Sequence, residues 1–108
     1  MIRSILIALA LFGTSQSAFA GEAKALYEAT CIACHGAKGQ GAIPGVPDLA
    51  KNNSLSKSDS ELVRNILNGF QTKGSPLAMP PKGGNPKLTE DDAKALVQYL
   101  RTMAAARK

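Results

Sequence analysis

The chain has 108 residues, two cysteines, one histidine, no tryptophan and a formal net charge of +5 at neutral pH. This length suits one small domain, and two cysteines three positions apart cannot supply a disulfide framework, so we expect another buried group to complete the core. The basic residues are scattered and not interleaved with aromatic ones, which argues against nucleic acid as a partner, whereas a mild positive charge favours acidic partners without selecting one.

Residues 1–20 have the pattern of a secretory signal peptide. Arg3 precedes an apolar run from 5 to 12, and Ala18 and Ala20 place small residues at a cleavage site after Ala20. A retained membrane span would need about 20 mostly apolar residues, and polar residues between 13 and 17 interrupt this run. We therefore expect residues 21–108 to form one domain that is exported to the periplasm. Arg3 is the only charged residue removed, so twelve basic residues against eight acidic ones leave a charge of +4.

A first helix is expected over residues 22–29, which are good helix formers that begin with an acid and lead into Cys31. Glycines and prolines between 36 and 47 then predict a long irregular loop. A second helix is indicated by Ser58 as N-cap, with Glu61 completing a capping box, and Gly69 predicts its end.

Residues 71–86 contain four prolines and three glycines, which exclude the interior of a helix or strand, and Met79 lies in this segment. A last helix begins at Thr89 as N-cap and is followed by acidic residues that suit its dipole. Its apolar face recurs at Leu96, Tyr99, Leu100 and Met103. No stretch alternates as a strand would, so the sequence predicts an all-α fold with about three to four helices.

The segment Cys31–His35 has the pattern C-x-x-C-H, which is typical of covalent haem c attachment. Two thiols three residues apart at the end of a helix project to nearly one side, so Cys31 and Cys34 can each form a thioether with one vinyl group of a porphyrin. His35 then lies under the ring, where a neutral imidazole nitrogen can ligate iron.

Other interpretations of the motif remain open. A thioredoxin-like thiol oxidoreductase would use Cys31 and Cys34 but needs a βαβ context that the sequence does not predict. A structural zinc site needs four ligands, and these cysteines with the single histidine supply three. A disulfide between the two cysteines would close a trivial loop and stabilise little, and a five-residue pattern can also occur by chance.

With Cys31–His35, the glycine-rich loop, residues 45–49 and residues 78–81 before a capped final helix, the chain resembles small bacterial class I c-type cytochromes. The resemblance covers nearly all of residues 21–108. It implies a helical bundle around one covalently bound haem c, whose iron is ligated by His35 and by Met79 from the later loop. It also implies that Pro47 accepts a hydrogen bond from His35 and that Leu49 packs on the ring.

Met79 has an alternative interpretation as an ordinary loop methionine. Proline-stiffened flanks favour it as a ligand, whereas Met103 lies on the presumed core face of the last helix. Tyr99 either stacks near the haem edge or packs with Tyr27 where the helices cross, and we favour the second.

With both axial positions filled, the expected function is one-electron transfer with redox protein partners and no small-molecule substrate or enzymatic activity. We expect a moderately positive potential and a molten or unfolded chain without haem. Four lysines flank the haem loops and form a candidate docking rim for an acidic partner, although they can equally be solvated lysines without a shared role: Lys38, Lys73, Lys82 and Lys87. Alternatives from other classes are a haem enzyme or gas sensor with Met79 off the iron, the thiol oxidoreductase, and the electron-accepting subunit of a larger enzyme.

Overall fold

The computed structural model describes residues 16–107, with side chains described from residue 21, and these residues form four α-helices and one short 3-10 turn. The helices are α1 (Gln16–Thr30), α2 (Ile32–His35), α3 (Asp59–Asn68) and α4 (Glu90–Ala105), and the 3-10 turn η1 spans Pro81–Gly84. Within the described range there is no strand, only an isolated antiparallel bridge between Phe70 and Met79. The all-α prediction is therefore confirmed.

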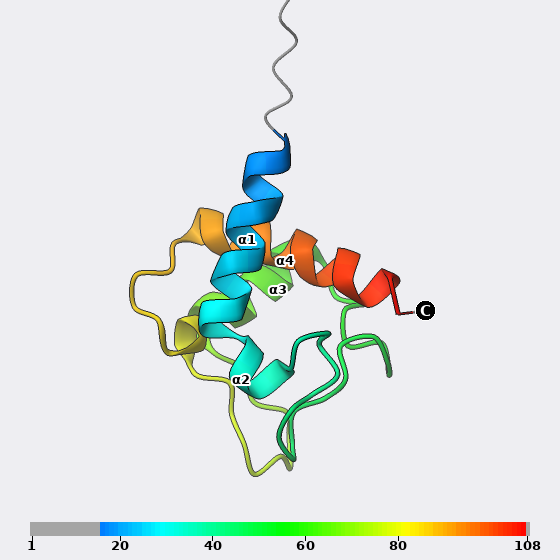
Figure 1. Ribbon diagram of the computed structural model, residues 1–108. Helices are drawn as coiled ribbons and strands as arrows, with labels where there is room; N and C mark the ends of the chain where they lie inside the picture. Colours follow the sequence, from blue (N-terminus) through cyan, green and yellow to red (C-terminus); the bar gives the residue numbers. More distant parts are fainter. Residues whose placement is uncertain (1–15, 108) are drawn as a thin grey trace, which may run out of the picture.

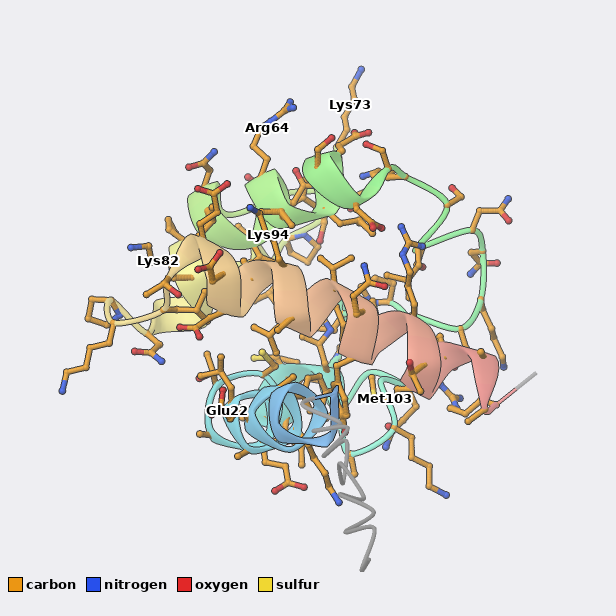
Figure 2. The ribbon with its side chains drawn as sticks, turned by 90° about the horizontal axis from the view of Figure 1, so that it is seen from above. Glu22, Arg64, Lys73, Lys82, Lys94 and Met103 are labelled. Atoms are coloured by element: carbon orange, nitrogen blue, oxygen red, sulfur yellow. The ribbon has the colours of Figure 1, made fainter. Side chains whose placement is uncertain are left out.

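Helix α4 is the middle layer of the molecule. Seen from above, it runs between α1 on one side and α3 on the other (Figure 2), while α2 and the long loops extend below the helix crossing (Figure 1). The core lies at these two helix interfaces. Its buried members are Tyr27, Leu62, Val63, Ile66, Leu88, Ala93, Leu96 and Val97.

The caps predicted for α3 and α4 are present. Ser58 Oγ accepts a hydrogen bond from Glu61 N at 3.2 Å, which satisfies one of the free amides at a helix start. At α4, Thr89 Oγ1 accepts from Asp92 N and the Asp92 carboxylate accepts from Thr89 N, so a complete capping box fixes where this helix begins. The predicted box at Ser58 is only half formed among the described hydrogen bonds.

Helix α1 begins earlier than the sequence predicts, at Gln16 rather than Glu22. It crosses the predicted cleavage site between Ala20 and Gly21, and most of the predicted signal peptide, residues 1–15, lies outside the described residues. Among the side chains described in α1, the buried ones are Ala23 and Tyr27. Both residues come after the predicted cleavage site in the sequence, so cleavage there would leave them in the mature chain.

None of the helices in the described range is long and apolar enough to cross a membrane. Residues 71–86 are largely irregular as predicted, with η1 as the exception. Pro81 begins this turn, where proline is tolerated because the first helical N–H has no partner within a helix.

Candidate haem-binding site

The C-x-x-C-H motif forms a short helical turn of its own. Helix α1 ends at Thr30, and Cys31 N donates to Tyr27 O at 2.8 Å, so the chain continues in helical conformation into α2. Gly36 ends the turn with a φ of +85°, a conformation that favours glycine. Cys31 and His35 are half-buried and Cys34 is exposed. The turn therefore presents two thiols and an imidazole in five consecutive residues.

A buried tyrosine fixes this turn to the helix crossing. The Tyr27 hydroxyl donates to the carbonyl oxygen of Gly36, and burial raises the pKa of Tyr27 to about 12. The Tyr27 and Tyr99 rings lie 5.3 Å apart between centroids, within the range of favourable aromatic pairs. The predicted packing of Tyr99 against Tyr27 is therefore present, and it connects α4 to the end of the motif.

His35 contains an unsatisfied buried polar atom. Its Nδ1 is buried and has no hydrogen-bond partner among the described residues, which is uncommon in folded proteins. Burial also lowers the pKa of His35, which favours the neutral imidazole that ligates metals. The hydrogen bond that the sequence analysis expected between Pro47 and His35 is thus not formed in this structure.

The segment that carries Pro47 nevertheless lies close to the His35 backbone. Gly41 N donates to His35 O at 2.8 Å, and a Cβ on Gly41 would lie 2.5 Å from Val46 O and 3.6 Å from Pro47 O. A glycine is required here because its missing side chain leaves room for these carbonyl groups. Leu49 is half-buried, and its N–H donates to Gly39 O at 2.8 Å, which closes the loop over the motif.

Met79 is held by its backbone. Phe70 N donates to Met79 O at 3.0 Å and Met79 N donates to Phe70 O at 2.7 Å, so the two residues form a closed pair. Gly69 allows this approach, since a Cβ there would lie 2.7 Å from Met79 O. The half-buried Met79 side chain packs against the hydrophobic core, as does Cys31. Met79, the second predicted iron ligand, and Cys31 therefore contact the same core.

The turn after Met79 rests on the residue before Cys31. A Cβ on Gly83 would lie 2.9 Å from Thr30 Cγ2, and Asn85 Nδ2 donates to Thr30 Oγ1 at 3.4 Å. The turn that follows Met79 is thus joined to the end of α1, directly before the motif. This contact is between residues 55 positions apart and has no local sequence signal.

The state of the thiols bears on the alternatives. The two cysteines are not joined to each other by a disulfide, and burial raises the pKa of Cys31 to about 11. A catalytic thiol needs a lowered pKa so that it is a thiolate near neutral pH. The environment of Cys31 is therefore the opposite of that in a thiol oxidoreductase.

These observations fit a haem. The donor set comprises two free thiols, an imidazole whose Nδ1 is buried and unsatisfied, and a thioether on a backbone-fixed loop, which matches covalent attachment and the ligand chemistry of c-type centres. Several apolar side chains also pack on the core yet stay only partly buried, as expected where a further apolar group is to be covered: Leu26, Ile32, Leu55, Leu67, Leu100 and Met103.

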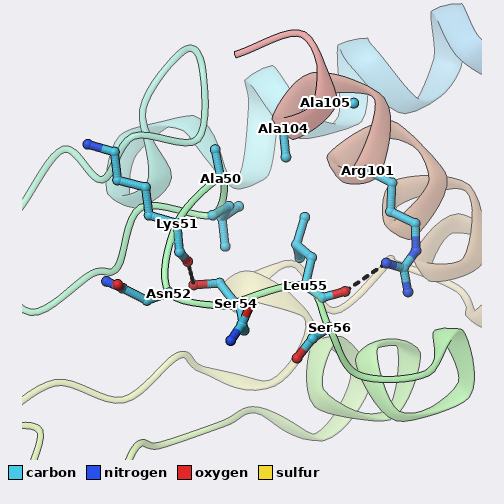
Figure 3. Close-up of a pocket in the computed structure, with 11 residues that line it drawn as sticks. Ala50, Lys51, Asn52, Ser54, Leu55, Ser56, Arg101, Ala104 and Ala105 are labelled. Carbon is cyan, nitrogen blue, oxygen red and sulfur yellow. Dashed lines mark hydrogen bonds between the residues drawn. The ribbon is translucent and has the colours of Figure 1, made fainter. Parts of the chain in front are cut away.

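A half-open recess lies between the loop 49–56 and α4, and Figure 3 shows Ala104 and the loop side chains of Lys51, Asn52 and Leu55 around it. Neither His35 nor Met79 lines it. The recess is therefore not the place where the predicted iron ligands lie.

Comparison with known proteins agrees with this chemistry. The family model for cytochrome c matches residues 20–104. A curated relative, cytochrome c-555 of Chlorobaculum thiosulfatiphilum, is 39% identical over 82 residues, which cover 75% of this chain and 92% of that protein. The crystal structure of the c-type cytochrome XoxG from Methylobacterium extorquens AM1 superposes with a TM-score of 0.62 at 33% identity, and it covers 81% of this chain and 51% of that chain.

A further relative is a much larger protein. Lupanine 17-hydroxylase [cytochrome c] of a Pseudomonas species is 33% identical over 85 residues, which cover 78% of this chain and only 11% of that protein.

The chain belongs to the cytochrome c family. It therefore carries one covalently bound haem c with its iron, transfers electrons and has redox proteins as partners. The class that the sequence analysis predicted, a small class I c-type cytochrome, is confirmed.

Three features of the site escape sequence reasoning. The Phe70–Met79 pair and the contacts of Thr30 join residues that no spacing rule connects. The ion pair of Asp48 with Arg107 joins residues 59 positions apart. Gly69 and Gly83 are the local signals for the first two features, and a glycine does not reveal which group will approach it.

Proposed function

We propose that this protein is a periplasmic one-electron carrier, exported by removal of residues 1–20, with a haem attached through Cys31 and Cys34. His35 and Met79 are the proposed axial ligands. The observation that carries the proposal is the buried, unsatisfied His35 Nδ1, because a ring nitrogen without a partner is expected where binding of the haem completes the surroundings of the imidazole. The backbone pair that fixes Met79 supports the second ligand.

The haem supplies reversible one-electron chemistry when bound. The residues around it determine which chemistry is left available. If His35 and Met79 both hold the iron, neither oxygen nor peroxide would find a free site, and a thioether ligand together with apolar neighbours would favour the reduced state. We therefore expect a moderately positive midpoint potential, and a strongly negative midpoint in a redox titration would contradict the ligand pair.

Pro47 and Leu49 are proposed to cover the histidine side of the haem. In the loaded protein, Pro47 O would accept a hydrogen bond from His35 Nδ1, which would fix the ring and increase its basicity as a ligand. The support is the position of Pro47 O beside Gly41, whose N–H is bonded to His35 O. A change in the His35 side chain on haem binding would form this bond, which is absent here.

The decisive experiment is an absorption spectrum of the exported protein with and without reductant, combined with its intact mass. One covalent haem on a polypeptide that begins at Gly21 supports both the attachment and the export. A weak long-wavelength band in the ferric spectrum supports the Met79–iron bond. A colourless product from a host able to attach haem, with the mass of the polypeptide alone, would refute the proposal.

The basic rim is the proposed docking surface for an acidic redox partner. Lys38, Lys73 and Lys87 are exposed, and Lys82 is half-buried in the turn that follows Met79. Transient electron-transfer contacts are small and steered by charge, so transfer rates should fall as ionic strength rises. Rates that are independent of salt would indicate that these lysines have no shared role.

A second candidate function is that of an electron-accepting unit for a larger dehydrogenase or hydroxylase. It is favoured by the relative in which the matching region forms only 11% of a hydroxylase. Co-purification of the tagged protein with such an enzyme would support this role, whereas a protein that elutes alone and exchanges electrons freely would support the independent carrier.

A further inference from the structure

Arg107, two positions beyond the end of α4, reaches back to the loop that follows the motif. Its Nη1 and Nη2 donate to Asp48 Oδ1 and Oδ2 at 2.7 and 2.9 Å, and Nη1 also donates to Lys38 O at 3.1 Å. The two charged side chains keep only 24% and 16% of their exposed surface. A two-pronged arginine–carboxylate pair fixes geometry as well as charge, so the end of α4 is fixed to this loop at two points.

Asp48 is in turn fixed to its own segment. Its Oδ1 also accepts from Ala50 N at 2.9 Å, and its carbonyl oxygen accepts from Ser54 Oγ at 3.1 Å. Hydrogen bonds from Arg107 and from Ala50 N hold the pKa of Asp48 at about 2. The carboxylate is therefore ionised throughout the range in which the protein would work.

The residues on either side of Asp48 are the two that were predicted to contact the haem and its ligand. Leu49 N is bonded to Gly39 O. On the other side, Pro47 O lies beside Gly41, whose own N–H is bonded to His35 O. Arg107 is thus connected to His35 through its ion pair with Asp48 and through the backbone groups of residues 47 and 41.

We propose that Arg107 is a positioning residue for His35. Through Asp48 it holds the 47–49 segment so that Pro47 O can accept a hydrogen bond from the N–H at His35 Nδ1 in the haem-loaded protein. This inference rests on the proposed function, because it concerns the same histidine as an iron ligand.

Arg101, within α4, provides a matched control. Its Nε donates to Asp59 Oδ1 at 2.9 Å, its Nη1 to Leu55 O at 2.7 Å and its Nη2 to Lys57 O at 2.9 Å. It therefore joins α4 to a carboxylate and to loop carbonyls, as Arg107 does, but its partners lie in the segment 55–59 before and within α3. Loss of Arg101 removes a similar set of bonds without touching the 47–49 segment.

The test compares haem-loaded wild type with R107Q, R107K, D48N and R101Q. The first readout is the exchange rate of the His35 Nδ1 proton in the ferrous protein, measured by NMR, and the second is the midpoint potential. We expect several-fold faster exchange in R107Q and D48N, a smaller acceleration in R107K because lysine keeps the charge but loses the two-pronged geometry, and no change in R101Q.

The midpoint potential distinguishes a positioning role of Arg107 from a simple effect of its charge. A weaker hydrogen bond at Nδ1 lowers the basicity of the ligand, which should raise the midpoint in both R107Q and D48N. Loss of one charge alone would move the midpoint down in R107Q and up in D48N, since the first leaves an anion and the second a cation.

The outcomes are distinguishable. Unchanged proton exchange in R107Q, or equal acceleration in R101Q, would overturn the positioning role while leaving the proposed function intact. A wild-type protein without covalent haem would overturn both. If R107Q does not accumulate as a folded protein, R107K and D48N decide the question by the same two readouts.

Discussion

Replacement of Gly69 by alanine adds one methyl group, but it should weaken both the stability of the fold and the predicted bond of Met79 to the haem iron. Gly69 has φ +84° and ψ 166°, a region that is populated almost only by glycine and costs other residues about 1–3 kcal/mol. The new Cβ would also lie 2.7 Å from Met79 O and 3.1 Å from Pro81 N. These neighbours are backbone atoms, so the segment that carries Met79 has to move.

That movement breaks one or both backbone hydrogen bonds between Phe70 and Met79, each worth about 1 kcal/mol net. The total expected loss in the free energy of unfolding is about 2–5 kcal/mol. Gly74 is the control for the new contacts, because it also has a φ of +84° but nothing within 4 Å of an added Cβ. Gly74→Ala should therefore cost only the strain of a positive φ in a residue other than glycine.

The assay is thermal unfolding of both haem-loaded variants together with the ferric absorption spectrum. We expect Gly69→Ala to melt below Gly74→Ala by at least about 4–8 °C, the shift that 1 kcal/mol produces in a domain of this size, and to lose or weaken the long-wavelength band of the Met79–iron bond. Equal melting temperatures with an intact band in both variants would refute the argument that Gly69 is required for the approach of Met79.

Three further predictions concern single side chains. Met79→Leu should abolish the long-wavelength ferric band and lower the midpoint potential because the thioether is lost, whereas Met103→Leu should leave the band in place; a band that survives in Met79→Leu excludes this residue as ligand. Tyr27→Phe should cost about 1–3 kcal/mol in denaturant unfolding because a buried carbonyl loses its donor. Since folding raises the pKa of Tyr27 to about 12, its proton contributes stability that is complete below pH 10 and is lost between about 10 and 12, so the wild-type advantage over Tyr27→Phe should shrink there. Folding lowers the pKa of Asp48 to about 2, so the stability it contributes is present above its ordinary pKa and should disappear between about pH 4 and 2; an acid-unfolding curve of Asp48→Asn identical to that of wild type would contradict this.

The sequence predicts the parts of the fold that depend on local signals. Ser58 and Thr89 mark the starts of α3 and α4 because an N-cap acts within three residues, and Gly69 marks an end. The start of α1 was predicted too late, since the acid at Glu22 suggested a first turn whereas the helix continues back to Gln16.

The candidate site likewise has parts that the sequence predicts and parts that it does not. The Cys31–His35 motif is a local pattern with a chemical meaning, and family resemblance singled out Met79. What could not be predicted is how these parts are held: the Phe70–Met79 pair and the reach of Arg107 depend on how distant segments pack. Resemblance also suggested a Pro47–His35 bond that this structure does not contain.

The contact between Tyr27 and Tyr99 has a practical consequence for folding studies. The chain has two tyrosines and no tryptophan, and both tyrosines lie where α1 crosses α4. The spectroscopic signals of these two rings therefore report on one location. The moment at which the two ends of the chain dock can be followed without any introduced label.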